Sequence, residues 1–348
     1  MNAMNPTLTA LPDAIDHELL GRLRVPTYDD VLAAAQRIAP YVRRTPLLRS
    51  PRLDALAGGP VWLKLENLQI TGSFKARGAF NALLNLDTDA RKRGVVAYST
   101  GNHGQAIAWA AHTLDIPATI VMPVDAPQNK VEKAERYGAR VVRYDRTKES
   151  REEIGMRLLA ETGATLVPPG DHPDVLAAQG TLAVEALLDL PADALANLGL
   201  FATPCGGGGM IAGCSLAVRA LAPQARLIAA EPEGFDDTVR SLASGKREQN
   251  APDAKTLCDA LQAATPAELP YAINGRCLAG AVAVSDTEVG AAIRYALEEL
   301  RLVVEPGGAV VLAALLAGRI DTQGRDSVVV LSGGNIDLPL LARLAQPQ

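Results

Sequence analysis

The sequence predicts an α/β protein with open, mostly parallel sheets flanked by helices. Short apolar stretches alternate with amphipathic stretches of helical length along most of the chain. Glycine and proline residues separate the two kinds of stretch, as expected for turns between strands and helices. Hydrophobic residues make up 48% of the 348 residues and charged residues 21%, which is enough apolar material for a large core. A chain of this length forms roughly two domains, or one unit with two lobes.

The first half of the chain predicts strands that are each followed by a helix. Residues 1–26 are expected to be a weakly structured arm, and a capping pattern at residues 27–30 begins a helix over residues 31–42. Further strands are expected at residues 61–66, 94–99, 118–123 and 140–144. The helices after them are expected at residues 73–84, 102–114, 129–138 and 148–162.

The alternation resumes after a proline-rich segment, residues 167–173, which we expect to connect two domains. Residues 245–275 are rich in proline and alanine and are expected to be irregular. Strands are expected at residues 198–203, 225–231 and 327–335, and helices at residues 174–190, 210–221, 287–301 and 307–318, with a short helix at the end. This order predicts a large domain of residues 1–92 and 172–348 and a small domain of residues 93–171.

Composition excludes several classes of protein. The net charge is −5, with 34 basic and 39 acidic residues and no basic run, so neither nucleic acid nor a membrane surface is an expected partner. The uncharged stretch between Ala194 and Val218 contains Pro204 and four glycines, so it does not predict a membrane helix. The N-terminus lacks the pattern of a signal peptide, and the four cysteines form no CxxC motif, so a reduced, cytoplasmic compartment is expected.

A lysine lies in the first turn of the helix expected at residues 73–84. Lys75 follows a strand and the Gly72 turn, in Ser73-Phe74-Lys75-Ala76. In the first helical turn the positive end of the helix dipole lowers the pKa of the amine. A neutral amine is the form that Schiff-base chemistry needs, whereas most lysines at such positions are solvated surface residues.

Four consecutive glycines follow another expected strand. Pro204 and Cys205 precede Gly206, Gly207, Gly208 and Gly209, and a helix is expected directly after them. Without side chains, main-chain N–H groups can converge on an anion at the helix N-terminus. The segment is neither a dinucleotide GxGxxG motif nor a P-loop, so it favours a single phosphate monoester.

Two further motifs follow expected strands. The motif at residues 99–104, Ser-Thr-Gly-Asn-His-Gly, offers N–H groups for a carboxylate and the amide of Asn102. The motif at residues 332–335, Ser-Gly-Gly-Asn, ends the last apolar strand. Because ligands bind at the carboxyl ends of parallel strands, the four motifs together predict one site.

These motifs resemble the fold-type II pyridoxal-phosphate (PLP) enzymes, whose two-lobed fold is like that of the tryptophan synthase β chain. The resemblance is to the threonine/serine dehydratase and serine racemase group and extends from about residue 26 to 344. It is carried by KLENLQITGSFKARGA, STGNHGQAIA, PCGGGGMIAG, AAEPEGFDD, VVEPGGA and VLSGGN.

The resemblance implies PLP as the cofactor and a role for each matched residue. Lys75 is expected to hold PLP covalently and to act as the general base, and Phe74 to lie against the PLP ring. Asn102 is expected to bond the ring hydroxyl and Ser332 to face the pyridine nitrogen. The phosphate is expected at Gly206, Gly207, Gly208 and Gly209. The substrate carboxylate is expected at Ser99, Thr100, Gly101, Asn102 and His103.

The implied reaction is the dehydration and deamination of L-threonine or L-serine to a 2-oxo acid and ammonia. A hydroxyl at Ser332 does not keep the pyridine nitrogen protonated, which suits prompt loss of the β-hydroxyl group. Serine or amino-acid racemisation and the dehydration of a 3-hydroxyaspartate-type diacid stay open as alternatives. The intact Lys75 disfavours an inactive ligand-binding relative, and the missing ribose-binding acid disfavours a dinucleotide-binding protein.

The resemblance adds further expectations. Thr100 lies where racemases place a catalytic acid, but its β-branch restricts χ1, so we expect elimination to exceed racemisation. Glu231, Phe235 and Asp237 resemble a divalent-cation site, and two carboxylates with a carbonyl suit Mg²⁺ or Ca²⁺. Ala260 replaces a usual glycine and Gly307 a usual serine or threonine. Relatives also suggest a homodimer or homotetramer.

Overall fold

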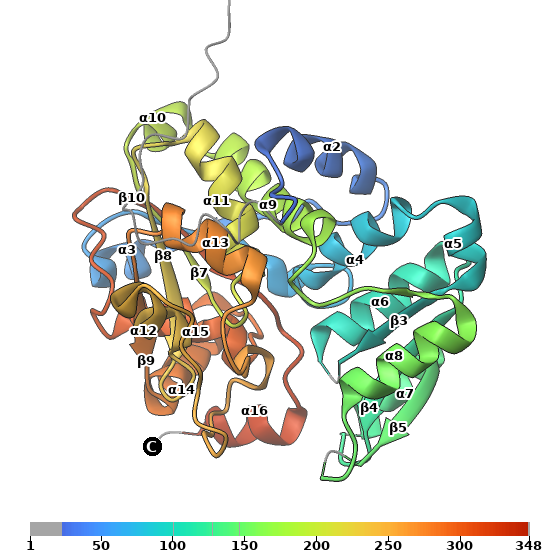
Figure 1. The fold of residues 1–348 in the computed structure, drawn as a ribbon. Helices are drawn as coiled ribbons and strands as arrows, with labels where there is room; N and C mark the ends of the chain where they lie inside the picture. The colour runs from blue at the N-terminus through green and yellow to red at the C-terminus, as the bar shows by residue number, and fades with distance from the viewer. Residues whose placement is uncertain (1–22, 100, 127, 146, 347–348) are drawn as a thin grey trace, which may run out of the picture.

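The structure contains two sheets. Some strands of the larger sheet come before the strands of the smaller sheet in the sequence, and the others come after them. The structure is a computed structural model that describes residues 23–99, 101–126, 128–145 and 147–346. The six strands of the larger sheet lie in the order β1-β2-β10-β7-β8-β9 (Figure 1). Only β1, at one edge, is antiparallel to its neighbour. The strands are β1 (Leu47–Arg49), β2 (Val61–Leu65), β7 (Leu198–Pro204), β8 (Arg226–Pro232), β9 (Gly280–Val284) and β10 (Asp326–Leu331).

The smaller sheet is entirely parallel and has the order β5-β4-β3-β6. Its strands are β3 (Val95–Tyr98), β4 (Ala118–Pro123), β5 (Arg140–Tyr144) and β6 (Thr165–Leu166). They all lie within the predicted small domain, residues 93–171, whose boundaries stay a prediction. The predicted boundary at residue 92 falls in the last turn of α5 (Thr88–Arg93).

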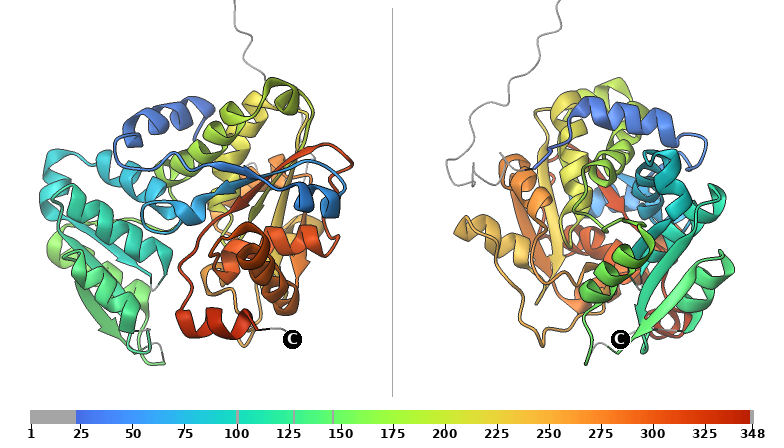
Figure 2. Two further views of the ribbon diagram at one scale, coloured as in Figure 1. Left: turned by 180° about the vertical axis from the view of Figure 1, so that it is seen from behind. Right: turned by 45° about the vertical axis from the view of Figure 1, so that its right-hand side comes forward.

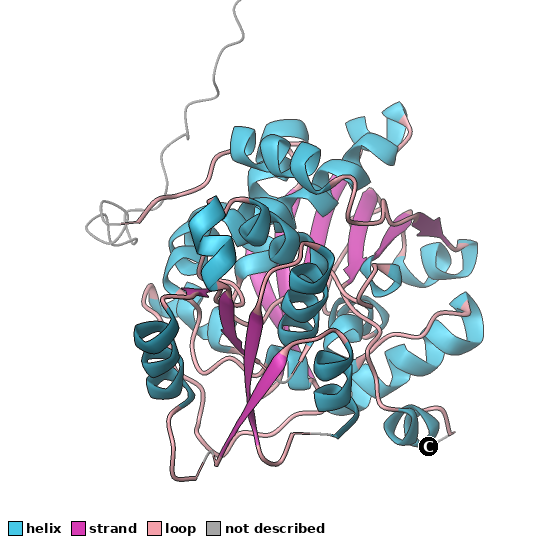
Figure 3. Ribbon diagram, turned by 90° about the vertical axis from the view of Figure 1, so that its right-hand side faces the viewer, coloured by secondary structure: helices cyan, strands magenta, loops and turns pink. Residues whose placement is uncertain are grey.

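Helices pack on both sheets, as expected for parallel α/β architecture (Figure 3). In the smaller sheet, α6 and α8 both contact β3 and β4. The helices of this part are α6 (Asn102–Thr113), α7 (Gln128–Arg136) and α8 (Arg151–Thr162). Around the larger sheet lie α3 (Pro51–Ala57), α9 (Pro173–Asp189), α10 (Ala192–Ala196), α11 (Gly209–Leu221), α12 (Asp237–Ser244), α13 (Glu268–Cys277), α14 (Asp286–Tyr295), α15 (Pro306–Leu316) and α16 (Leu338–Leu344).

One helix, α4 (Lys75–Leu84), joins the two parts of the molecule. It packs against α6 on one side and α9 on the other (Figure 2). The helix α2 (Tyr28–Ile38) packs across α4 and α9 and is held at its start by a capping box of Thr27 and Asp30. Helix α4 therefore connects the helices of the smaller sheet with those of the larger sheet.

The structure differs from the sequence expectations in the segment from residue 245 to 284. Residues 245–275 were expected to be irregular, but α13 begins at Glu268, and β9 follows it. The sequence of β9, Gly-Ala-Val-Ala-Val, is poor in residues that favour strands, and Pro270 weakened the helical pattern of α13. The expected helix at residues 287–301 is α14 followed by a π-helical turn, Ala296–Leu300. No helix among the described residues is long and apolar enough to cross a membrane.

Candidate active site

The amine of Lys75 lies at the first position of α4, as the sequence predicts. Its Nζ donates a hydrogen bond to the main-chain oxygen of Pro169 at 2.6 Å and lies 5.0 Å from the centre of the Phe74 ring. The side chain is half-buried, and burial lowers the pKa of Lys75 to about 8. A substantial fraction of the amine is therefore neutral near pH 8, as a nucleophile or base requires.

Main-chain hydrogen bonds tie this lysine to the end of β10. The N–H of Phe74 donates to the oxygen of Ser332 at 3.1 Å, and the N–H of Gly334 donates to the oxygen of Gly72 at 2.8 Å. Ser73 and Gly333 form an isolated antiparallel bridge between them. Ser332 is buried at this junction, next to the main chain that leads into Lys75. Two of the four predicted motifs therefore meet here.

The third motif reaches the same place through Asn102. The Nδ2 of Asn102 donates to Glu305 at 2.6 Å, and its Oδ1 accepts from Asn335 at 2.7 Å. Burial, helped by the charge of Asp259, raises the pKa of Glu305 to about 7, although the hydrogen bond from Asn102 acts to lower it. A Cβ on Gly333 would overlap the Glu305 carboxyl, so any larger residue there would have to displace that carboxyl.

Glu305 is a site residue that the sequence analysis missed. It lies in the motif VVEPGGA, which contributes to the resemblance, but no role was assigned to it. The available signal was a lone acid in the apolar run Leu302 to Ala309, directly before a proline that begins a helix. A charged residue in such a run is a candidate for a buried partner, here Asn102.

The fourth motif ends β7 and begins α11. Gly208 precedes α11 with a φ of +87°, in the left-handed region that favours glycine, and no side chain caps this helix. The first N–H groups of α11 are therefore free to bind an anion. Gly170 lies directly against Gly209, and its neighbour Pro169 accepts the bond from Lys75. The glycine segment and the lysine thus face each other across residues 169–170.

The loop before α6 is only partly described. The N–H of Gly101 donates to the hydroxyl of Ser99 at 3.1 Å, and Thr100 lies outside the described residues. The ring of His103 is buried, with Nε2 2.8 Å from the oxygen of Val167. Burial, helped by the charge of Lys75, lowers the pKa of His103 to about 3, so the ring is neutral. The role of this loop in binding a carboxylate stays a prediction.

The predicted cation site at Glu231, Phe235 and Asp237 is a compact turn between β8 and α12. Glu231 accepts from the N–H groups of Thr238 and Val239 at 3.1 and 3.0 Å and so caps α12. Asp237 Oδ1 accepts from Asn250, whereas its Oδ2 is buried without a hydrogen-bond partner. Burial raises the pKa of Glu231 to about 8 and that of Asp237 to about 6.

This turn offers a hard cation one carboxylate oxygen without a hydrogen-bond partner, on Asp237, and falls short of a complete protein ligand set. Among the described residues, no group of three or more His, Cys, Asp or Glu side chains is placed to hold a metal ion. A cation here would bind the free oxygen of Asp237, with Glu231 and the carbonyl of Phe235 as further ligands. It would also neutralise two carboxylates that burial makes costly to ionise.

We expect Mg²⁺ or Ca²⁺ to stabilise the protein through this turn. At 100 times its dissociation constant, a ligand that binds only the native state adds about 2.7 kcal/mol to the free energy of unfolding. Thermal unfolding with added cation and with excess chelator measures the effect, and Asp237→Asn should remove it. An identical melting curve in both conditions would eliminate the cation site.

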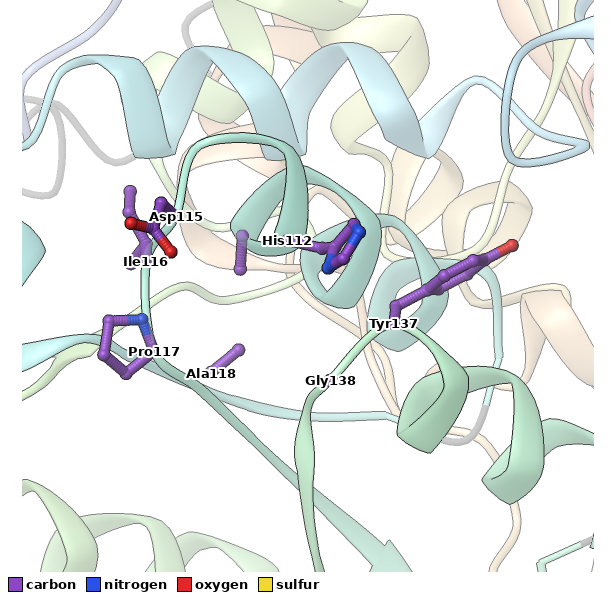
Figure 4. A pocket seen from close by; sticks show the side chains of 8 residues that line it. His112, Asp115, Ile116, Pro117, Ala118, Tyr137 and Gly138 are labelled. Carbon is purple, nitrogen blue, oxygen red and sulfur yellow. The ribbon is translucent and has the colours of Figure 1, made fainter.

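A cavity of about 190 Å³ lies elsewhere in the molecule, between the ends of α6 and α7 (Figure 4). It is lined by residues that include His112, Asp115 and Tyr137. Ala118, which begins β4, also lines it, whereas the candidate site follows the last residue of β3. Because these two strands are parallel, the cavity lies at their amino ends, whereas the candidate site lies at the carboxyl end of β3. The cavity therefore does not belong to the site.

Replacing Gly208 with alanine should separate the cost of a left-handed backbone from the loss of an anion site. A Cβ at Gly208 would lie 2.7 Å from Asn274 Nδ2, whereas Gly58, with a φ of +70°, has no atom within 4 Å of such a Cβ. Both Gly208→Ala and Gly58→Ala should lower the free energy of unfolding by about 1–2 kcal/mol. Only Gly208→Ala should also weaken PLP affinity, by roughly tenfold or more. Equal PLP affinities in a titration of the two variants would exclude the glycine segment from the site.

The fold and the site define an enzyme that combines a lysine amine with an anion-binding helix start at the carboxyl ends of parallel strands. Residues 38–334 match the model of the pyridoxal-phosphate dependent enzymes, and the chain belongs to this family. Enzymes of the family use PLP. The uncapped N-terminus of α11 fits its phosphate, and the amine of Lys75 fits its covalent attachment. The predictions of family, fold class and cofactor are confirmed.

Proteins of known activity align along nearly the whole chain. The L-threo-3-hydroxyaspartate ammonia-lyase of a Pseudomonas species is 45% identical over 323 residues, which cover 92% of this chain and 99% of that protein. The enzyme of the same name from Saccharomyces cerevisiae is 42% identical over 321 residues, 92% of this chain and 96% of that protein. The structure of maize serine racemase is 37% identical, with a TM-score of 0.87, and covers 92% of this chain and 97% of that one. The chain is therefore a PLP-dependent enzyme of the ammonia-lyase and racemase group.

Proposed function

We propose that this enzyme removes water and ammonia from an L-3-hydroxy amino acid and that L-threo-3-hydroxyaspartate is its preferred substrate. The observation that carries the reaction is the amine of Lys75, partly neutral near pH 8 and held between the glycine segment and Ser332. The preference for a diacid is supported by the two ammonia-lyases of that specificity, at 45% and 42% identity.

Each motif has a task in this proposal. Bound PLP supplies an electron sink that weakens the bonds at the substrate α-carbon. The first N–H groups of α11 would hold its phosphate, Asn102 would bond its ring hydroxyl and Ser332 would face its pyridine nitrogen. The amine of Lys75 takes the proton from the α-carbon as a general base. N–H groups of the loop before α6 hold the substrate carboxylate.

The overall reaction is balanced, because the water lost in the elimination equals the water consumed in the later hydrolysis, and the net product besides the 2-oxo acid is ammonia. The β-hydroxyl group leaves as water after Lys75 has taken the α-proton. One water is consumed when the released enamine hydrolyses to ammonia and a 2-oxo acid. Hydroxyaspartate therefore gives oxaloacetate and threonine gives 2-oxobutanoate, each with one ammonia.

Threonine and serine remain the second candidate substrates. The chemistry at Lys75 is the same for them, and the segment against the glycine loop includes apolar Ala260 and Leu261, which suit a methyl group. This was the main expectation from the sequence, and the relatives described above favour the diacid over it.

A substrate panel tests the proposal. We expect kcat/KM for L-threo-3-hydroxyaspartate to exceed those for L-threonine and L-serine by at least roughly tenfold, about 1.4 kcal/mol of barrier. Ammonia, 2-oxo acid and the chirality of the recovered amino acid are measured together. Faster turnover of threonine or serine would overturn the diacid preference, and D-serine as the main product would establish a racemase instead.

A further inference from the structure

An ion pair joins the two parts of the molecule beside the candidate site. The Nζ of Lys130, on α7, lies 2.7 Å from an Oδ atom of Asp259, which begins a short 3₁₀ helix, Asp259–Leu261. α7 packs against α6 of the smaller sheet, whereas the 3₁₀ helix packs against α15 beside the larger sheet. The pair therefore spans the space between the two sheets.

Two contacts place the Asp259 segment against the cofactor end of the site. A Cβ on Gly206 would lie 3.1 Å from the Cα of Leu261, so the 3₁₀ helix rests on the glycine loop. A Cβ on Gly307 would lie 3.2 Å from the Cβ of Ala260, so the same helix also meets the start of α15. Asp259 thus belongs to the segment that lies between the expected phosphate position and the start of α15.

The charges of the pair also reach the other end of the site. The Glu305 carboxyl, which bonds Asn102 at 2.6 Å, is close enough to both partners for their charges to act on it. The charge of Asp259 raises the pKa of Glu305, and that of Lys130 lowers it. Asn102 opens the helix after the loop expected to hold the substrate carboxylate, so a cation lies near the place where the substrate is expected to bind.

The two partners differ in their access to water. The side chain of Lys130 is 10% exposed, whereas that of Asp259 is 55% exposed. Leaving the mostly buried ammonium of Lys130 without an anionic partner would cost stability. The carboxylate of Asp259 is half-exposed, so water would still hydrate it if it lost Lys130. The exchange of Asp259 for another anion is therefore cheap. A substrate methyl group carries no charge and cannot replace Asp259 as the partner of Lys130, whereas a second substrate carboxylate can.

We propose that Lys130 binds the side-chain carboxylate of a diacid substrate and that Asp259 is the internal anion that this carboxylate replaces. The inference rests on the proposed function, because it names the residue that would select hydroxyaspartate. Lys130 acts as a specificity residue, and the reaction at the α-carbon does not involve it.

The kinetic test compares variants with opposite expected effects. Lys130→Ala should lower kcat/KM for L-threo-3-hydroxyaspartate by roughly 30-fold or more, as for loss of one partner of a buried charge pair, and leave L-threonine within about threefold. Asp259→Asn frees Lys130 and should lower the KM for the diacid by roughly threefold or more. Lys133→Ala, on the same helix with the same change of charge, should change neither substrate. If both Lys130→Ala and Asp259→Asn lowered kcat/KM equally for the two substrates, the ion pair would have only a structural role, and the inference would be overturned.

A binding test needs no turnover. Succinate, an unreactive dicarboxylate, should bind the PLP-loaded wild type and Lys133→Ala, and should bind Lys130→Ala at least tenfold more weakly in calorimetry. Butyrate, with one carboxylate, should not distinguish the three proteins. Unchanged succinate binding in Lys130→Ala would overturn the assignment of Lys130. Wild type that prefers threonine would contradict the proposed function, and the succinate result would still decide the role of Lys130.

Discussion

Replacing Lys75 with alanine is expected to abolish ammonia release, with a loss of kcat of roughly 10⁴-fold or more, because the amine both attaches PLP and moves the α-proton. The visible absorbance of the attached cofactor should vanish with it. Lys92→Ala is the matched control and should behave as wild type, because Lys92 is exposed and forms an ion pair with the exposed Asp89. Steady turnover by Lys75→Ala would remove this lysine from the reaction.

The pH dependence of PLP attachment provides a second measure of Lys75. Burial lowers the pKa of its amine to about 8 from 10.5, so protonation blocks attachment below about pH 8 rather than below about pH 10. The attachment rate of PLP-free protein should therefore rise with pH and level off above about 8. The unfolded chain binds more protons at this lysine between pH 8 and 10.5, so its contribution to stability rises with pH in that window. A midpoint near pH 10 would mean that the amine is solvated.

The parts of the site that are local in sequence could be predicted, because each motif follows a strand and three of the four lead into a helix. Lys75 and Gly208 follow strands of the larger sheet, and parallel pairing brings the carboxyl ends of these strands together. Asn102 follows β3 of the smaller sheet and joins the same site through its hydrogen bond to Glu305. Glu305 and the pair of Lys130 and Asp259 could not, because their roles depend on partners more than a hundred residues away. A single acid or lysine carries no periodic signal that would reveal such a partner.

The cation site shows a different limit. The spacing of Glu231 and Asp237 indicated two nearby carboxylates, and the charge of Asp237 does act on Glu231. The spacing did not reveal that Glu231 caps α12, because a cap depends on where the helix begins. The sequence therefore identified the acids but not the competing partners that decide whether a metal binds.

Replacing Arg77 with methionine should cause the largest loss of stability among single substitutions near the site. Arg77 lies two residues after Lys75 and is fully buried, as is Glu66, to which it donates at 2.9 and 2.8 Å. It also donates to Glu185 at 2.7 and 2.8 Å. Burial lowers the pKa of Arg77, but the two carboxylates raise it more, so the guanidinium is charged.

The expected cost of Arg77→Met is about 3–5 kcal/mol, because Glu66 is left fully buried without its counterion. Glu185 is affected less, because it keeps its ion pair with Lys64 at 2.7 Å. Urea unfolding monitored by circular dichroism measures it as a lower midpoint with an unchanged slope. Arg24→Met is the control, since Arg24 is 58% exposed in its pairs with Asp30 and Asp174 and should cost less than about 1 kcal/mol.

A second substitution shows whether stranded charge is the cause. In the Arg77→Met background, Glu66→Gln removes one stranded carboxylate, so it should restore part of the lost stability, whereas Glu66→Gln alone should destabilise the wild type. Glu66 lies in the short helix Glu66–Leu68 before the Gly72 turn, and Arg77 lies in the first turn of α4. Their ion pair therefore fixes the turn that presents Lys75, and Arg77→Met should also weaken PLP binding at temperatures where the variant is still folded. If Arg77→Met cost no more than Arg24→Met, the network would not hold this turn, and the position of Lys75 would have to depend on the hydrogen bonds between β10 and residues 72–74 alone.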